Sequence, residues 1–230
     1  MTAATLHEFP SREVLAGTLA AKVASVLSEA IEARGRALLA VSGGTTPALF
    51  FRTLSQIDLD WPKVTVTLVD ERFVPEDSPR SNAGLAKANL LQGKAAAARF
   101  VGLYHDAPTV EEAARAAGDA IDGLGLPLDV AVLGMGGDGH TASFFPDAPT
   151  LPKLLATENQ ALVLPVHAVS GIEPRLTLTM PVIAGARFIA LHIEGDGKRN
   201  VLASVLAGEK LPIGAVLDAA HEPVEVFWAP

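Results

Sequence analysis

A glycine-rich segment in the second half of the chain, GMGGDGHT, begins at Gly134 and contains Asp138 and His140. A histidine side chain changes its charge close to neutral pH, so it can take a proton from an attacking water. Asp138 stands two residues before His140 and is a candidate to orient the imidazole, while glycines such as Gly136 let a small molecule approach the backbone. We predict that His140 is a general base. The alternative is a histidine that caps a helix or fills a polar gap in the core.

A second segment, SGGTTP, joins the apolar run 37–41 to an expected helix that has Pro47 in its first turn. Backbone N–H groups and hydroxyls at such a junction can hold an anion, so Ser42, Gly43, Gly44 and Thr45 are candidate phosphate ligands. The alternative is an ordinary turn in which the two glycines supply positive φ. The segment lacks the lysine of a P-loop, so a nucleoside triphosphate is not indicated.

Three cationic residues are candidate ligands for an anionic substrate. Arg72 follows an apolar run, Arg175 follows Pro174 ahead of another run, and Lys198 lies in a glycine-flanked loop. Arginine can bind a phosphate with two hydrogen bonds, whereas lysine acts as a point charge. Each of the three has a plain alternative as a surface charge, and Arg72 can instead pair with Asp70 or Glu71.

Other chemistries fit the sequence less well. The glycines of GMGGDG match a dinucleotide fingerprint, but Pro146 and Pro149 interrupt the helix that should follow, and Glu158 precedes the next strand instead of closing it. The chain has no G-x-S-x-G motif, so Ser42 and Ser143 remain only formal candidates for a nucleophile. None of the six histidines forms an H-E-x-x-H motif, and Asp138 with His140 would give only two metal ligands. We expect a metal-free site.

Composition restricts the function classes further. Hydrophobic residues make up 49% of the 230 residues and charged residues 19%, which is typical of a packed globular protein. The net charge of −8, without a run of Lys or Arg, disfavours a nucleic-acid partner but permits a small anion in a locally positive cleft. With no cysteine, no signal-like segment and no long uninterrupted apolar run, the expectations are a cytoplasmic location and no membrane partner.

The periodicity of apolar residues predicts alternating helices and strands. The expected helices span about 11–34, 81–91, 109–122 and 198–206, and the expected strands 37–41, 64–69, 128–133, 161–166, 176–180, 188–193 and 224–228. This alternation, without a linker, predicts one α/β domain over residues 1–230 with a largely parallel sheet flanked by helices. The segments SGGTTP, DERFVP, GMGGDGHT and EGDGK each follow an apolar strand, so we expect them to converge at the carboxyl edge of the sheet.

Four ordered blocks resemble the 6-phosphogluconolactonase family: SGGTTP from Ser42, DERFVPEDSPRSN from Asp70, GMGGDGHTASFFP from Gly134 and PRLTLT from Pro174; EGDGK, which ends at Lys198, also fits. The resemblance implies a modified Rossmann-like fold, related to glucosamine-6-phosphate deaminase and ribose-5-phosphate isomerase. It also implies hydrolysis of 6-phosphogluconolactone to 6-phosphogluconate without a cofactor. By the same resemblance, His140 matches the family's base and Arg72 an arginine that helps to hold the substrate. Gly43, Gly44, Thr45, Arg175 and Lys198 match positions around the phosphate and the sugar, and Asn82 closes the DER block.

Two other functions remain alternatives. An amino-sugar-phosphate deaminase or isomerase would need a base at the C2 proton, which Asp70 could supply. A non-catalytic sugar-phosphate sensor would need an output module, and no DNA-binding helix-turn-helix segment flanks the domain. For the favoured activity the expected partner is a sugar phosphate, and the expected state is a monomer or small homo-oligomer.

Overall fold

The structure is a computed structural model that describes residues 4–167 and 173–230. The strands in these ranges are β1 (Thr5–Glu8), β2 (Ala37–Val41), β3 (Val64–Leu68), β4 (Asp70–Arg72), β5 (Arg99–Val101), β6 (Val130–Leu133), β7 (Val163–Val166), β8 (Arg175–Leu178), β9 (Ile189–Glu194) and β10 (Glu225–Ala229). The α-helices are α1 (Arg12–Arg34), α2 (Ala48–Leu54), α3 (Asn82–Asn89), α4 (Val110–Asp122), α5 (Leu151–Leu154), α6 (Met180–Ala184), α7 (Asp196–Leu206) and α8 (Pro212–Ala219). Short 3₁₀ helices occupy Trp61–Lys63 and Gly93–Ala97.

The main sheet is parallel and has the strand order β1-β10-β9-β6-β2-β3-β5. Its central strands β2 and β6 are buried at every position, as expected for strands that helices cover on both faces. The predicted α/β fold class with a largely parallel sheet is therefore confirmed.

A second sheet, with the order β4-β8-β7, is antiparallel and was not expected. The segment DER was predicted to open a loop after its strand, but Asp70–Arg72 forms β4 and pairs with β8. Val69 links the two sheets, because its N–H donates to the Val41 carbonyl at 2.9 Å and its carbonyl accepts the Leu178 N–H at 2.9 Å. The partner strand is distant in sequence, so local periodicity contains no sign of this pairing.

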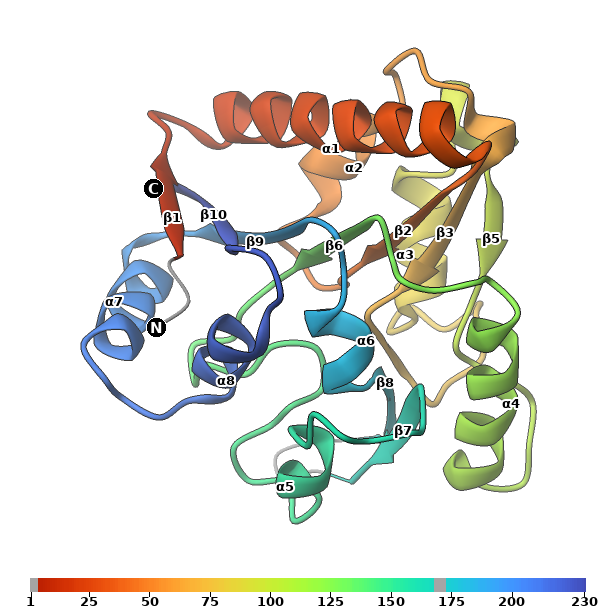
Figure 1. Cartoon of the computed structure of the whole chain (residues 1–230), viewed down its shortest axis with the longest axis vertical. Helices are drawn as coiled ribbons and strands as arrows, with labels where there is room; N and C mark the ends of the chain where they lie inside the picture. The colour runs from red at the N-terminus through yellow and green to blue at the C-terminus, as the bar shows by residue number, and fades with distance from the viewer. Residues whose placement is uncertain (1–3, 168–172) are drawn as a thin grey trace.

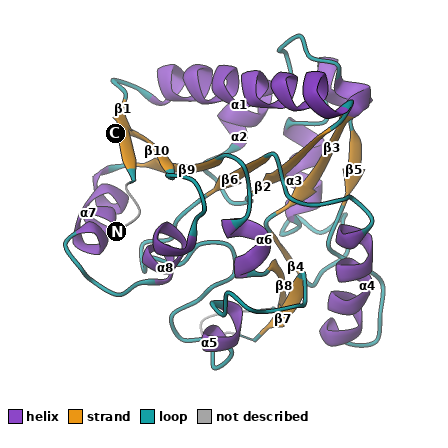
Figure 2. Ribbon diagram, viewed as in Figure 1, coloured by secondary structure: helices purple, strands orange, loops and turns teal. Residues whose placement is uncertain are grey.

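The helices form layers on both sides of the parallel sheet. Figure 1 shows α1 along one side, with α6 and α8 on the other, and Figure 2 shows the strands between these layers. The predicted first helix is confirmed with its caps: the Ser11 side chain accepts the Val14 N–H, and Gly35 ends the helix with a φ of 73°. The expected helix 109–122 is α4, and the Thr109 side chain caps its start by accepting the Glu112 N–H at 3.2 Å.

Several elements were missed, each for a local reason. Strand β1 is largely exposed and polar at the edge of the sheet, so it lacks an apolar run. The expected strand 176–180 ends at Leu178, because Pro181 favours the first turn of a helix and α6 begins at Met180. Strand β5 has only three residues.

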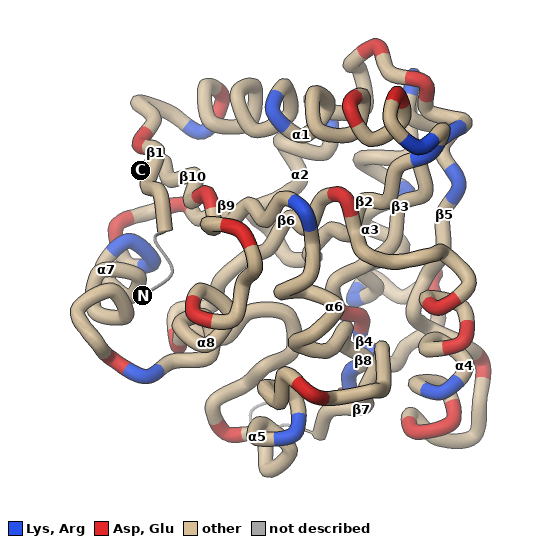
Figure 3. Tube along the Cα trace, in the orientation of Figure 1, with Lys and Arg blue, Asp and Glu red and all other residues tan. Residues whose placement is uncertain are grey.

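Helix α1 is long and apolar enough to cross a membrane by length and composition alone. Half of its apolar window is buried inside the protein, where it packs against α2, β2 and β10. Such burial is typical of a core helix, and no other helix of the described residues passes the same test. The buried apolar residues form one contiguous cluster, and Figure 3 shows Lys and Arg scattered over many elements instead of forming one stripe.

Candidate active site

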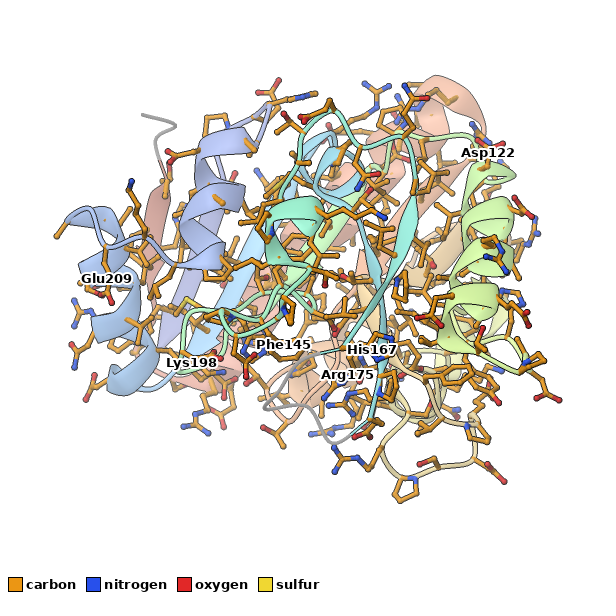
Figure 4. All side chains as sticks on the ribbon, turned by 90° about the horizontal axis from the view of Figure 1, so that it is seen from below. Asp122, Phe145, His167, Arg175, Lys198 and Glu209 are labelled. Carbon is orange, nitrogen blue, oxygen red and sulfur yellow. The ribbon has the colours of Figure 1, made fainter. Side chains whose placement is uncertain are left out.

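A cleft of about 310 Å³ lies where the predicted loops converge at the carboxyl edge of the parallel sheet. It is lined by the segment 42–47 after β2, by β4 and the start of α3, by the segment after β6, and by residues of β8, β9 and α7. Every predicted site residue except Asp138 lines the cleft. In Figure 4 the labels of Lys198, Phe145 and Arg175 follow one another from left to right across the lower half of the view.

His140 and Asp138 form a hydrogen-bonded pair at the rim of this cleft. Nδ1 of His140 lies 2.6 Å from Oδ1 of Asp138, which also accepts the His140 backbone N–H at 3.1 Å. Burial disfavours the Asp138 carboxylate, but the hydrogen bonds and charge of His140 outweigh it and hold the pKa of Asp138 below its usual value. With Nδ1 engaged by the carboxylate, Nε2 is the nitrogen left for a substrate or water.

A glycine is required beside this pair. A Cβ atom on Gly136 would lie 2.2 Å from Nδ1 of His140 and 2.6 Å from Oδ1 of Asp138. The neighbouring Gly137 has no atom within 4 Å of its own Cβ position. The glycine-rich sequence therefore makes room for the His140–Asp138 pair itself.

Ser42 connects the segment 42–47 to the end of β6 and the loop after it by two hydrogen bonds. Its hydroxyl donates to the Val132 carbonyl at 3.0 Å and accepts the Gly134 N–H at 3.1 Å. Gly44 has a φ of 97°, which favours glycine, and a Cβ on Gly43 would collide with the amide of Asn82 at 1.8 Å. Gly44 is thus favoured by its backbone conformation and Gly43 by the close approach of the Asn82 side chain, and the Ser42 hydroxyl is engaged by backbone groups of the neighbouring strand and loop.

Asp70 is a buried carboxylate that faces the cleft and has two polar neighbours. Its Oδ2 accepts the Ser143 hydroxyl at 2.6 Å, and its Oδ1 lies 3.5 Å from Nδ2 of Asn82. The same amide nitrogen of Asn82 donates to the Asp70 backbone carbonyl at 2.8 Å. Ser143 is fully buried and its hydroxyl is used by Asp70, so the arrangement disfavours Ser143 as a nucleophile.

Arg72 and Arg175 face each other as register partners of β4 and β8. In the described residues, the buried Nε atom of each has no hydrogen-bond partner. The Arg175 guanidinium lies 5.5 Å from the ring centre of Phe145, whose own ring centre is 4.7 Å from that of His140. Burial lowers the pKa of Arg175, with Asp70 opposing the shift and Arg72 adding to it. These cations are available to an anion in the cleft.

Lys198 adds a positive charge beside the segment 42–47. Its Nζ lies 3.4 Å from Oγ1 of Thr46, and burial lowers the pKa of the ammonium while Glu194 opposes that shift. Lys198 is close to the start of α7, directly after β9. The fold thereby brings Lys198, from late in the sequence, beside the candidate phosphate ligands of the segment 42–47.

Three site residues were missed by the sequence reasoning. Glu71 is fully buried, and its carboxylate accepts the backbone N–H groups of Arg72, Asn82 and Ala83, each at 2.7 Å, and the Ser81 hydroxyl at 3.1 Å. Burial raises the pKa of Glu71, and these four hydrogen bonds oppose the shift. Phe145 and His192 also line the cleft. Phe145 belongs to the block GMGGDGHTASFFP but was not singled out within it, and His192 looks like an ordinary core position of a strand. The DER motif itself was the available signal for Glu71.

The family profile described as "Glucosamine-6-phosphate isomerases/6-phosphogluconolactonase" matches residues 10–228. The chain belongs to this family. It is similar to a 6-phosphogluconolactonase of Mesorhizobium japonicum, with 60% identity over 225 residues that cover 97% of this chain and 94% of that protein. It is also similar to the crystal structure of a 6-phosphogluconolactonase from Shewanella baltica, with a TM-score of 0.95 and 40% identity, over 99% of this chain and 98% of that one.

A monomeric glucosamine-6-phosphate deaminase has the same fold. The TM-score is 0.80 at 20% identity, and the match covers 98% of this chain and 97% of the deaminase. The predicted resemblance and the predicted relation to the deaminase fold are both confirmed. Among residues 4–167 and 173–230, no three His, Asp or Glu side chains gather where they could hold a metal ion.

Proposed function

We propose that His140 activates the water that hydrolyses 6-phospho-D-glucono-1,5-lactone to 6-phospho-D-gluconate, with the substrate bound in the cleft at the sheet edge. The activity predicted from the sequence, lactone hydrolysis in the pentose phosphate pathway, is confirmed by the family and by the relative with 60% identity. The chain is therefore a lactone hydrolase. The observation that carries the role of His140 is its 2.6 Å contact with Asp138 at the rim of a cleft lined by cations.

The phosphate of the substrate binds between the segment 42–47, Lys198 and Arg175. Lys198 lines the cleft beside Thr46, with its Nζ 3.4 Å from the Thr46 hydroxyl, so its charge lies next to the proposed phosphate position. Within the described ranges the buried Nε of Arg175 has no hydrogen-bond partner, and a guanidinium can meet two phosphate oxygens at once. Gly43, Gly44 and Thr45 add a polar backbone wall to the same part of the cleft.

His140 acts first as a base and then as an acid. Nε2 removes a proton from water, and the water oxygen attacks the lactone carbonyl carbon to form a tetrahedral oxyanion. The bond between this carbon and the ring oxygen then breaks, and the ring oxygen takes the proton from the imidazolium. General acid–base catalysis of this kind contributes a factor of roughly 10²–10⁴. Asp138 keeps the ring oriented and stabilises its positive charge.

Arg72 is the donor that we assign to the oxyanion. It lines the cleft on the strand next to Arg175, and its Nε–H has no partner in the part of the chain that the structure describes. A fixed cationic donor stabilises charge that develops in the transition state more than it stabilises the neutral carbonyl. Gly136 and the backbone after β6 complete this side of the site.

The deaminase alternative rests on Asp70, which would have to take a proton from C2 of an amino sugar. Its Oδ2 already accepts the short hydrogen bond from Ser143. In our account Asp70 balances part of the positive charge of the cleft, and Asn82 helps to shape it, without a role for either as a base. Glucosamine 6-phosphate tests this directly, because only the alternative releases ammonia from it.

The experiment measures 6-phosphogluconate formed from freshly generated lactone, with spontaneous hydrolysis subtracted, beside the same assay on glucono-1,5-lactone without phosphate. We expect acceleration that is much larger for the phosphorylated lactone. Equal rates on the two lactones would contradict the phosphate site, and ammonia release from glucosamine 6-phosphate would support the alternative.

The remaining assignments are proposals of the same kind. One domain over residues 1–230 is supported by the single contiguous core. A cytoplasmic location fits a charged sugar-phosphate substrate, and we keep a monomer or small homo-oligomer, without nucleic-acid or membrane partners, as the expected state.

A further inference from the structure

The guanidinium groups of Arg72 and Arg175 lie close to each other although both are positively charged. Contacts outside the cleft therefore help to hold these two side chains in place. They are register partners across β4 and β8, and both line the cleft. Like charges at short range repel each other, more strongly where water is partly excluded. The contacts that hold the two guanidinium groups therefore influence how well the cleft binds an anion.

Arg80 and Glu173 form an ion pair beside these two arginines. Nη2 of Arg80 donates to Oε2 of Glu173 at 2.9 Å, and Nε of Arg80 donates to Oε1. This two-bond geometry is the most directional pairing of an arginine with a carboxylate. The hydrogen bond from Arg80 also lowers the pKa of Glu173, against the effect of burial, and the charge of Arg175 acts in the same direction.

The Arg80–Glu173 ion pair is linked to both cleft arginines, through a hydrogen bond to Arg72 and through the chain to Arg175. The Arg80 backbone carbonyl accepts a hydrogen bond from Nη1 of Arg72. Glu173 is joined through Pro174 to Arg175, and the Pro174 carbonyl accepts the Phe73 N–H at 2.8 Å, next to Arg72. Neither Arg80 nor Glu173 is among the residues that line the cleft.

We propose that the Arg80–Glu173 ion pair is a positioning clamp that holds Arg72 and Arg175 ready for an anionic substrate. The clamp acts through the two arginines and does not touch the substrate. Its effect on turnover rests on the proposed function of the cleft, whereas its effect on anion binding does not. The ion pair joins Arg80, just before α3, to Glu173, just before β8, and these two positions are far apart in sequence.

The test replaces Arg80 or Glu173 by a neutral residue and compares the effect with that of breaking a control ion pair. Arg80→Met and Glu173→Gln should each lower kcat/KM for the lactone about three- to tenfold and weaken binding of 6-phosphogluconate by a similar factor. The melting temperature should stay close to that of the wild type, because partly exposed ion pairs contribute little to stability. Lys87→Met and Glu76→Gln break a nearby exposed pair with 2.7 Å contacts and should leave kcat/KM unchanged.

Two further variants separate positioning from a general structural role. The conservative variant Arg80→Lys, which keeps a positive charge beside Glu173, should retain most of the wild-type kcat/KM. In an Arg72→Met background, loss of Arg80 should cost clearly less than in the wild type, because residues that act as a unit are not additive. Full activity and product binding in the two single variants, or the same loss in the control pair, would overturn the clamp. If the wild type bound 6-phosphogluconate but did not accelerate hydrolysis, the proposed function would fail, while weaker product binding in the two variants would still support the clamp.

Discussion

Nδ1 of His140 lies 2.6 Å from Oδ1 of Asp138, two residues earlier on the same loop. The same carboxylate oxygen accepts the His140 backbone N–H, so the short loop fixes both the ring and its partner. A neutral imidazole in this contact carries its proton on Nδ1 and leaves the lone pair of Nε2 for catalysis. The local sequence DGH thus supplies the base and the group that selects its tautomer.

Asp138→Asn should lower kcat by roughly 10²-fold and change KM little, because the amide no longer selects the tautomer or stabilises the imidazolium. Steady-state kinetics on the phosphorylated lactone measure both constants. A variant with wild-type kcat would show that the contact is not used in turnover.

Gly136→Ala should lower kcat at least about tenfold, since the new methyl group would lie 2.2 Å from Nδ1 of His140 and must displace the ring. Gly137→Ala is the matched control, because its Cβ position has no neighbour within 4 Å. Crystal structures and kinetics of the two variants check the displacement. The prediction is wrong if both alanines have the same effect.

Glu71→Ala should destabilise the protein by about 3–5 kcal/mol, because it leaves two buried N–H groups, one part-buried N–H group and one hydroxyl without their acceptor. The loss should also disturb Arg72 and Asn82, which Glu71 holds through their backbones. Urea unfolding measures the change, and a loss below about 1 kcal/mol would show that water replaces the carboxylate at no cost.

Glu194 should contribute to a loss of stability in acid. Its pKa is held below the usual value by the His192 ring, 3.3 Å from Oε1, against the effect of burial, and by the charges of His192, Arg12 and Lys198. A lowered carboxyl pKa means that the folded state gains stability above the unfolded pKa, near 4.5, and loses it as the pH falls through the folded pKa. Melting temperatures from pH 7 to 3 should therefore fall less steeply below pH 4.5 in Glu194→Gln than in the wild type. Parallel curves would contradict this contribution.

The sequence predicts the gathering of the site well, for a physical reason. Ser42, Gly134 and Lys198 each lie at or just after the carboxyl end of a parallel strand, and such ends share one edge of the sheet. To place these three residues together, it was therefore enough to recognise the parallel strands that precede them in the sequence. The identity of the base followed from a local motif, DGH, whose two partners are neighbours in the sequence.

What the sequence could not indicate depends on pairings between distant segments. Strand β4 exists because Asp70–Arg72 meets β8, and this ladder brings Arg72 beside Arg175. The burial of Glu71 against the start of α3 depends on the same arrangement. His192 stands inside a buried apolar run in β9, so its place in the cleft follows only from the packed structure.

The most direct test of the account is the rate of lactone hydrolysis by wild type and His140→Ala under saturating substrate, together with the affinity of each for 6-phosphogluconate. We predict that wild type accelerates hydrolysis, that His140→Ala loses a factor of about 10²–10⁴ in kcat, and that both bind the product with similar affinity. A His140→Ala variant that keeps near-wild-type kcat would contradict the assignment of His140 as the base.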